Sequence, residues 1–410
     1  MSVDRNTRIL VIARGVRTLG QSAITLLLAL YLNALGLDLV HIGLVLSVDV
    51  AGTFSLAVAV GLIGNMFGRR RLLTGIMLLA SVASLVMAFT TFVPAILVAV
   101  FFGSFTAGSG AGGPLQPLEV ASIAEVAPAE LRTRLLALMF VISTIATACG
   151  ALLIALPPVT ERLFGVDEVM AYRAMFVLYA LFQLISAFLY MRLSSSVEAK
   201  MARREWSNPF KLHSRKRIFT LTALFAADGF GGSLIGQSLV AFWFSTRFGL
   251  TLNSLSMVFF VSSLLSAASL WASAKIAERI GLVKTMVLAH IPSNILLIAA
   301  AFSPVAWMAI LFWQLRSLLA QMDIPARESY TMAVVHPEER VAMASIGGVG
   351  RSGAFVIGPA TSTALWNTLG AAIPFLACGV VKIAYDLLLY TMFRKVKPPE
   401  EENGEISQTP

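Results

Sequence analysis

Charged residues are scarce in this chain of 410 residues. Asp, Glu, Lys and Arg together make up only 13% of it, while 57% of the residues are hydrophobic. A soluble protein of this length cannot bury so much apolar surface. The composition therefore excludes an ordinary soluble domain and predicts a membrane protein.

Cysteine and histidine are rare as well. The two cysteines, Cys149 and Cys378, lie inside apolar runs, so we expect free thiols and no disulfide framework. The four histidines are scattered and do not show the spacing of a metal site, and neither a P-loop nor a nucleophile elbow occurs. The chain is thus expected to have no metal, no cofactor and no enzyme activity, which also excludes an ATP-driven pump.

Acidic residues are fewer than basic ones, 22 against 31, which gives a net charge of +9. In a soluble domain this excess would suggest nucleic acid. Here the basic residues fall in short loops between apolar runs, which is the orientation signal of a multi-pass membrane protein. We therefore expect a lipid bilayer and no nucleic acid as the partner.

Twelve apolar runs are long enough to cross a bilayer as helices. They cover residues 9–35, 40–65, 72–92, 95–118, 134–158, 170–192, 218–246, 252–275, 283–302, 305–326, 343–366 and 371–393. The first run is too long for a cleaved signal peptide, so we expect it to be retained. The fold class is therefore an all-α membrane protein with twelve transmembrane helices.

The distribution of Lys and Arg predicts the orientation. With the N-terminus inside, the outer loops carry only Arg162, Arg173 and Arg247, and nearly all other basic residues lie on the inner side. An even number of spans with both termini in the cytoplasm produces this bias. We expect a multi-pass protein of the cell (inner) membrane.

A long polar segment divides the chain. We expect an N-terminal six-helix half at 1–192, a basic cytoplasmic linker at 193–216, a C-terminal six-helix half at 217–394 and a disordered cytoplasmic tail at 395–410.

The two halves are related in sequence. The Gly- and Arg-rich hairpin at Gly64–Arg71 has a weaker copy at Ala277–Lys284, and Pro117–Arg134 parallels Pro325–Arg340. Two parallel six-span halves are a transporter plan, with the substrate near the midplane between them.

The loop between the second and third runs resembles that of the major facilitator superfamily. Gly61, Gly68, Arg69 and Arg70 match the family pattern, whereas Asn65 stands where the family usually has Asp. The resemblance extends over nearly the whole chain. It implies twelve helices in two halves and secondary active transport by alternating access.

The resemblance also implies an inner gate formed by the hairpins and by charges near them. Its members are Gly61, Asn65, Gly68, Arg69, Arg70, Arg71, Glu119, Arg132, Glu278, Arg279, Asp323, Arg327, Glu328 and Arg340. Because Asn65 brings no charge, we expect Arg69 to Arg71 to meet Glu119 or Glu125.

Ionisable residues inside spans each cost about 2.5–3.5 kcal/mol to insert, so each needs a reason to be there. Asp228, beside a glycine cluster, is the first candidate for taking up and releasing a proton, and Asp49 is the second. The alternative for Asp228 is a structural ion pair with an arginine. Lys382 and Asp386 are four residues apart and are expected to form a structural pair.

Arginines in spans must meet a carboxylate, a carbonyl or a substrate anion. Arg316 and Arg351 fall near the midplane and are candidates for binding an anion. Arg14 and Arg17 lie on one face of the first predicted helix, with Gln21 one turn further. They are either anchors that extend to the inner membrane surface or a cationic rim for an anionic substrate.

These residues predict a secondary active transporter for a small organic solute, anionic or zwitterionic, coupled to H⁺ and monomeric. One alternative is a proton-driven multidrug efflux pump, which would differ in the charge of its substrate. Another is a membrane receptor or scaffold without transport, although the short loops offer little soluble surface for it.

Overall fold

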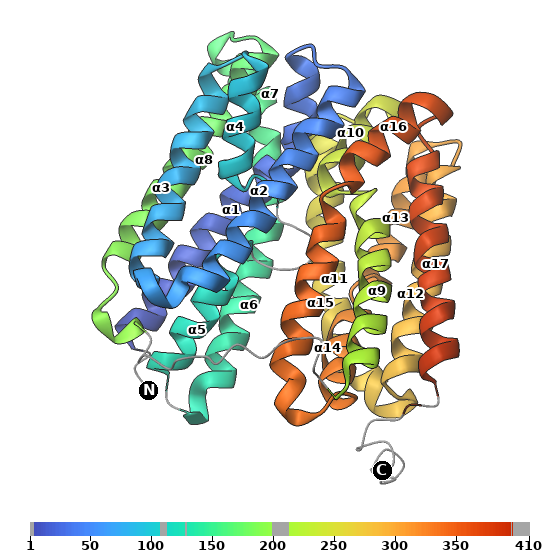
Figure 1. The fold of residues 1–410 in the computed structure, drawn as a ribbon. Coiled ribbons are helices and arrows are strands. Elements are labelled where there is room, and N and C mark those ends of the chain that lie inside the picture. The colour runs from blue at the N-terminus through green and yellow to red at the C-terminus, as the bar shows by residue number, and fades with distance from the viewer. Residues whose placement is uncertain (1–3, 107–112, 128, 199–212, 395, 397–410) are drawn as a thin grey trace. The chain divides into compact units, whose positions relative to one another are not determined.

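The computed structural model describes residues 4–106, 113–127, 129–198, 213–394 and 396, and these residues are almost entirely helical (Figure 1). The helices before residue 200 are α1 Arg5–Ala34, α2 Leu39–Phe67, α3 Arg69–Phe89, α4 Val93–Gly103, α5 Gln116–Val126, α6 Ala129–Leu152, α7 Leu156–Phe164 and α8 Glu168–Met191. Those after it are α9 Arg215–Ser233, α10 Gln237–Phe248, α11 Leu252–Ile280, α12 Leu282–Ala301, α13 Ala306–Leu319, α14 Asp323–Ala333, α15 Arg340–Phe355, α16 Gly358–Leu369 and α17 Ile373–Phe393.

Among the described residues, nine helical segments are long and apolar enough to cross a membrane. The other three predicted spans, 95–118, 305–326 and 343–366, each fall on two shorter helices: α4 and α5, α13 and α14, and α15 and α16. The all-α class predicted from the apolar runs is confirmed. The count of twelve spans and the position of the termini stay predictions.

The helix breaks have local causes. Helix α4 ends where Ser104 adopts a left-handed conformation with φ 48°. Helix α9 ends just after its glycine cluster, and α10 starts at Gln237. Helix α16 begins with Pro359 in its first turn, where the missing proline N–H costs nothing. Short polar and glycine-rich stretches thus divide runs that are uniformly apolar in composition.

Acidic caps start several of the long helices. Asp38 accepts the backbone N–H of His41 at 2.8 Å at the start of α2, and Asp167 accepts that of Met170 at 3.0 Å at the start of α8. Such caps satisfy donors that the helix itself leaves unpaired. The hydrogen bond from the His41 backbone lowers the pKa of Asp38.

The chain forms two compact units. Unit 1 comprises Met1–Arg203 and Gly236–Phe260, and unit 2 comprises Arg204–Ile235 and Val261–Pro410. Helix α10 therefore belongs with α1 to α8, and the Ala29 N–H of α1 donates to the Ser238 hydroxyl of α10 at 2.9 Å. The predicted domain limits around residues 193–216 stay a prediction.

Close helix packing builds each unit. In unit 1, α3 lies beside α8, and in unit 2, α9 lies beside α15 and α12 beside α17 (Figure 1). Helices α2 and α4 touch at Gly52, where a Cβ would run into the backbone carbonyl of Phe101. Small residues at such crossings let membrane helices approach closely, and this packing positions the charged side chains described next.

Candidate functional site

Two arginines of α1 share one carboxylate in unit 1. Arg14 donates to Glu119 at 2.6 Å and Arg17 donates to it at 3.1 Å. The Tyr190 hydroxyl of α8 donates to the same carboxylate at 2.6 Å, and Glu119 is fully buried. The candidate cationic rim is thus a buried cluster that joins α1, α5 and α8.

This cluster has one positive charge more than its carboxylate balances. The remaining polar contacts of Arg14 are to neutral groups, Ser143 at 2.5 Å and Gln116 at 3.2 Å. Among the described residues, Arg17 forms its ion pair with Glu119 alone. Buried charges are expensive unless they are paired, so this surplus of one positive charge is a costly feature of the cluster.

Gln21 and Asp49 support the break after α4. The Gln21 amide donates to the Ser104 carbonyl at 2.7 Å. The Asp49 carboxylate accepts the backbone N–H groups of Phe105 and Thr106, both at 2.9 Å, and also the Thr106 hydroxyl. These contacts hold the left-handed turn in place, which gives Asp49 a structural task beside its candidate role in proton coupling.

Asp228 lies at the centre of a second cluster, in unit 2. Lys382 donates to its carboxylate at 2.5 Å and Arg351 at 3.2 Å, while Arg327 lies at 3.6 Å and His290 at 4.0 Å. Asp228 is almost fully buried. Four cationic or titratable groups from α12, α14, α15 and α17 therefore converge on one carboxylate of α9.

The glycines after Asp228 make this convergence possible. A Cβ on Gly231 would lie 3.1 Å from the Lys382 side chain, and a Cβ on Gly232 would lie 3.6 Å from its Nζ. A Cβ on Gly229 would lie 2.8 Å from the Arg351 carbonyl. The glycine cluster thus gives the lysine and α15 room to reach Asp228.

Two further carboxylates complete this cluster. Asp323 accepts from Arg327 at 2.7 Å, and Asp386 contacts the His290 Nδ1 at 2.9 Å. The expected pair of Lys382 with Asp386 is wrong, because Lys382 turns to Asp228 and Asp386 to His290. Because Gly231 and Gly232 have no side chains, the Lys382 side chain can extend from α17 to Asp228 on α9.

A small pocket opens beside these arginines. It has a volume of about 160 Å³, and its lining includes Arg327, Arg351, Phe225, Thr331 and Ser352. The Arg351 side chain is 24% exposed, and its Nε has no hydrogen-bond partner among the described residues. The partly exposed guanidinium of Arg351 thus lies at this pocket while it contacts Asp228.

Arg316 differs from the other buried arginines. Its guanidinium lies over the Trp313 ring at 4.8 Å from the centroid. Within the part of the chain that the structure describes, it forms no ion pair, and its buried Nε has no hydrogen-bond partner. An arginine in a predicted span without a carboxylate is the kind of group that a substrate anion would satisfy.

The arginine hairpin contacts its own unit. Gly68 turns the chain with φ +84°, and Glu198 then accepts the N–H groups of Arg69 at 2.6 Å and Arg70 at 3.2 Å. The Arg69 side chain lies 3.8 Å from Glu125. Of the two expected partners of the hairpin, Glu119 or Glu125, the structure has Glu125 beside Arg69, whereas the buried Glu119 is held by the arginines of α1.

The other gate candidates are spread over several helices. Arg71, Arg132, Arg279 and Glu328 are exposed, and Arg340 donates to the Met332 carbonyl at 2.8 Å. Gly61 is an exposed position on α2, and the side chains of Asn65 and Glu278 lie outside the described residues. Among the gate candidates whose side chains are described, the structure pairs Arg327 with Asp323, and it places Arg69 beside Glu125 and Glu198.

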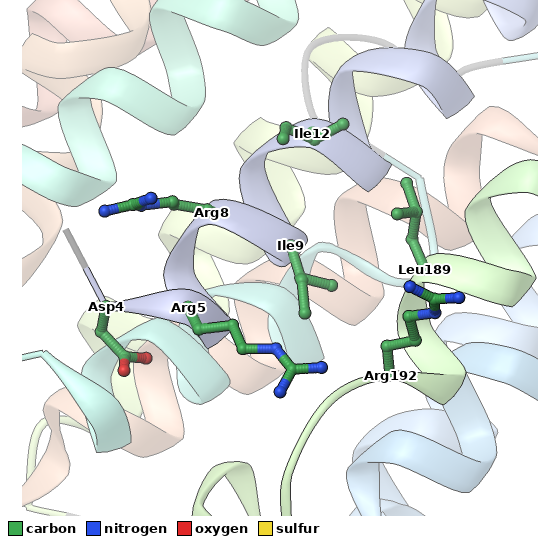
Figure 2. Close-up of a pocket in the computed structure, with 7 residues that line it drawn as sticks. All are labelled: Asp4, Arg5, Arg8, Ile9, Ile12, Leu189 and Arg192. Atoms are coloured by element: carbon green, nitrogen blue, oxygen red, sulfur yellow. The ribbon is translucent and has the colours of Figure 1, made fainter.

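A basic pocket lies at the start of α1 (Figure 2). It has a volume of about 500 Å³ and is lined by Arg5, Arg8 and Arg192 together with apolar residues such as Ile12, which is 54% exposed. Guanidinium groups beside exposed apolar side chains are typical of the cytoplasmic membrane surface.

Sequence reasoning missed three residues of these clusters and assigned the wrong partner to a fourth, Lys382. The missed residues, Tyr190, Glu198 and His290, each contact a candidate residue that is distant in the chain. His290 could have been identified from the sequence, because a titratable side chain inside an apolar run needs an explanation. Glu198 could not, because it lies in a polar segment among many charges.

We expect the E119Q substitution to destabilise unit 1 far more than Y190F. The former leaves two buried guanidinium groups without a counter-charge, at a cost of about 3–5 kcal/mol, whereas the latter removes one hydrogen bond worth about 1 kcal/mol. Unfolding of the purified variants in detergent measures both. Equal losses would show that Glu119 does not balance the arginines.

Comparison with known proteins agrees with this architecture. The family model described as Major Facilitator Superfamily matches residues 10–320 and 221–409. The "Uncharacterized membrane protein YJR124C" of Saccharomyces cerevisiae is 24% identical, and the match covers 95% of this chain and 94% of that protein.

Solved structures of transporters share the fold. The bacterial homolog to human lysosomal transporter Spinster is similar with a TM-score of 0.74 at 15% identity, covering 96% of this chain and 98% of that one. The nucleoside transporter NupG is similar with a TM-score of 0.75 at 14% identity, covering 95% and 100%. The chain belongs to the Major Facilitator Superfamily and is a multi-pass secondary transporter of that family, not an enzyme.

Proposed function

We propose that this transporter moves a small organic anion or zwitterion, coupled to protons, by alternating access. The observation that carries the proposal is the pocket beside Arg327 and Arg351 in unit 2. It combines a partly exposed guanidinium, a second arginine and the aromatic ring of Phe225.

The size and chemistry of the pocket favour an acidic group. A cavity of about 150 Å³ holds a molecule about the size of benzene, so the pocket of about 160 Å³ suits a carboxylate or phosphate group with its neighbouring atoms. Arginine binds such groups through two parallel hydrogen bonds. A cationic drug would meet two positive charges here, which disfavours the alternative of multidrug efflux.

Other unbalanced arginines support the same substrate charge. Arg316 forms no ion pair among the described residues, and Arg14 and Arg17 share a single carboxylate. Each unit therefore carries its own surplus of buried positive charge. A substrate anion would offset this surplus while it is bound, and that electrostatic gain would favour its uptake from water.

The inner gate stays part of the proposal. In unit 1, Glu198 and Glu125 hold Arg69, and in unit 2, Asp323 holds Arg327. Arg327 also lines the proposed substrate pocket. A bound anion that draws Arg327 away from Asp323 would thus connect substrate binding to the release of a gate pair.

Binding of matched small ligands tests the substrate class. We expect benzoate or phenyl phosphate to raise the melting temperature of the purified wild-type protein, since a ligand at 100 times its Kd adds about 2.7 kcal/mol of stability. R351A and R316A should lose most of this shift because they remove the anion-binding donors. R162A, which removes an exposed arginine on α7, is the matched control and should keep it.

The same series separates the alternatives. Benzyltrimethylammonium has the ring but the opposite charge, and phenylalanine is the zwitterion. Stabilisation by the ammonium compound alone would favour efflux of cations. An anion shift that is unchanged in both R351A and R316A would contradict the proposal.

We also propose that the protein is a monomer in the cell (inner) membrane with both termini in the cytoplasm. The positive-inside bias and the basic pocket at the start of α1 support this orientation. In a background without Cys149 and Cys378, an impermeant maleimide added to intact cells should label R162C and not R71C. Labelling of R71C alone would reverse the orientation.

A further inference from the structure

His290 is a buried histidine in the middle of a predicted span. Its side chain is 6% exposed, and it sits two residues before Pro292 inside α12. The Nδ1 atom contacts Asp386 Oδ1 at 2.9 Å, while Nε2 lies 3.5 Å from Lys382 Nζ and 4.0 Å from Asp228 Oδ1. The imidazole therefore links the carboxylate of α17 to the pair that joins α17 and α9.

The helices of this cluster and those next to it carry further charged or titratable groups. They are Asp228 from α9, Arg316 from α13, Asp323, Arg327 and Glu328 from α14, Arg351 from α15, and Cys378, Lys382, Tyr385 and Asp386 from α17. Helix α16 has no charged residue. Of these groups, Asp386, Lys382 and Asp228 lie within 4.0 Å of the His290 ring nitrogens.

The charges that touch one another are balanced when His290 is neutral. Lys382, Arg327 and Arg351 carry three positive charges, and Asp228, Asp323 and Asp386 carry three negative ones. A proton on the imidazole would break this balance by one unit. Binding of one proton at His290 would therefore change the net charge of the cluster from zero to +1 while the other residues keep their charges.

Asp228 is poorly suited to take that proton. Three permanent or near-permanent cations lie within 3.6 Å of its oxygens, and each of them stabilises the ionised carboxylate. Among the described residues, Asp386 forms its ion pair with His290, and its Oδ2 has no hydrogen-bond partner. Imidazole is also the side chain that titrates closest to neutral pH.

We propose that His290, held by Asp386, is the proton-binding site of this transporter. In the neutral form, Nδ1–H donates to Asp386 and Nε2 accepts from Lys382. A proton that binds the Nε2 lone pair removes this acceptor and repels the Lys382 ammonium, while Nε2 at 4.0 Å from Asp228 is too far away to donate in its place. Protonation would then weaken the Lys382–Asp228 contact between α17 and α9.

This step deepens the proposed function, because Asp228 also holds Arg351 in the anion pocket. If Lys382 leaves Asp228, that carboxylate holds Arg351 more strongly, and fewer donors remain for the substrate. If the proton leaves His290, Arg351 is freer to bind the anion. Proton and anion would thus compete through one carboxylate.

Nitrogen-15 NMR of the imidazole tests the proposal without any substrate. The variant H41Q/H213Q/H336Q removes the three exposed histidines and leaves His290 as the only one. We expect its spectrum in detergent to change from the neutral Nδ1–H tautomer to imidazolium between pH 9 and pH 5. D386N should lower the midpoint by at least one pH unit, a tenfold loss of proton affinity.

D323N is the matched control, since Asp323 belongs to the same cluster but contacts Arg327 instead of His290. Its midpoint should stay within a few tenths of a unit of the parent. If D386N does not fold, K382M serves in its place and should raise the midpoint by removing the adjacent cation. A His290 that stays neutral from pH 9 to pH 5, or a midpoint equal in the parent and in D386N, would overturn the proposal.

The outcomes separate this inference from the proposed function. A titrating His290 in a protein that no anion stabilises would leave the proton site standing and overturn the substrate class. Anion binding lost in R351A together with a His290 that does not titrate would do the reverse.

Discussion

A charge inside a membrane span must meet an opposite charge, and this constraint organises both units. In unit 2, Asp228 is the point at which it is met: its carboxylate holds Lys382 of α17 and Arg351 of α15 and lies beside Arg327 of α14. The helices that carry these groups must approach α9 closely enough for side chains to touch. The glycines after Asp228 allow that approach, so the packing of the unit and its electrostatics have one cause.

The two units pair their buried charges in different ways. Unit 1 gathers two guanidinium groups on one carboxylate and adds a tyrosine hydroxyl. Unit 2 builds a balanced network of three cations and three carboxylates around a histidine. The first arrangement leaves a permanent positive surplus. The second can change its net charge by one proton, which suits coupling.

Much of the fold could be predicted from composition, because long apolar runs have few alternatives to helices in a bilayer. The breaks inside three of the predicted spans could not, since they depend on local backbone geometry such as the left-handed conformation of Ser104 and the start of α16 at Pro359. For the site, the need for partners around Asp228, Arg14 and Arg351 followed from their burial. The identity of those partners did not, because pairs such as Arg14 with Glu119 depend on how distant helices pack. The four-residue spacing also led to a wrong prediction, because Lys382 pairs with Asp228 and not with Asp386.

The contact between Lys382 and Asp228 is the central claim of this account, and a double-mutant cycle tests it directly. D228N alone should cost about 3–5 kcal/mol of stability, since it strands buried cations. In the D228N/K382M variant the stranded ammonium is gone, so the double variant should be more stable than the sum of the single losses predicts, by about 1–3 kcal/mol. Losses that simply add, measured by unfolding in detergent, would show that the two residues are not coupled and would contradict the account.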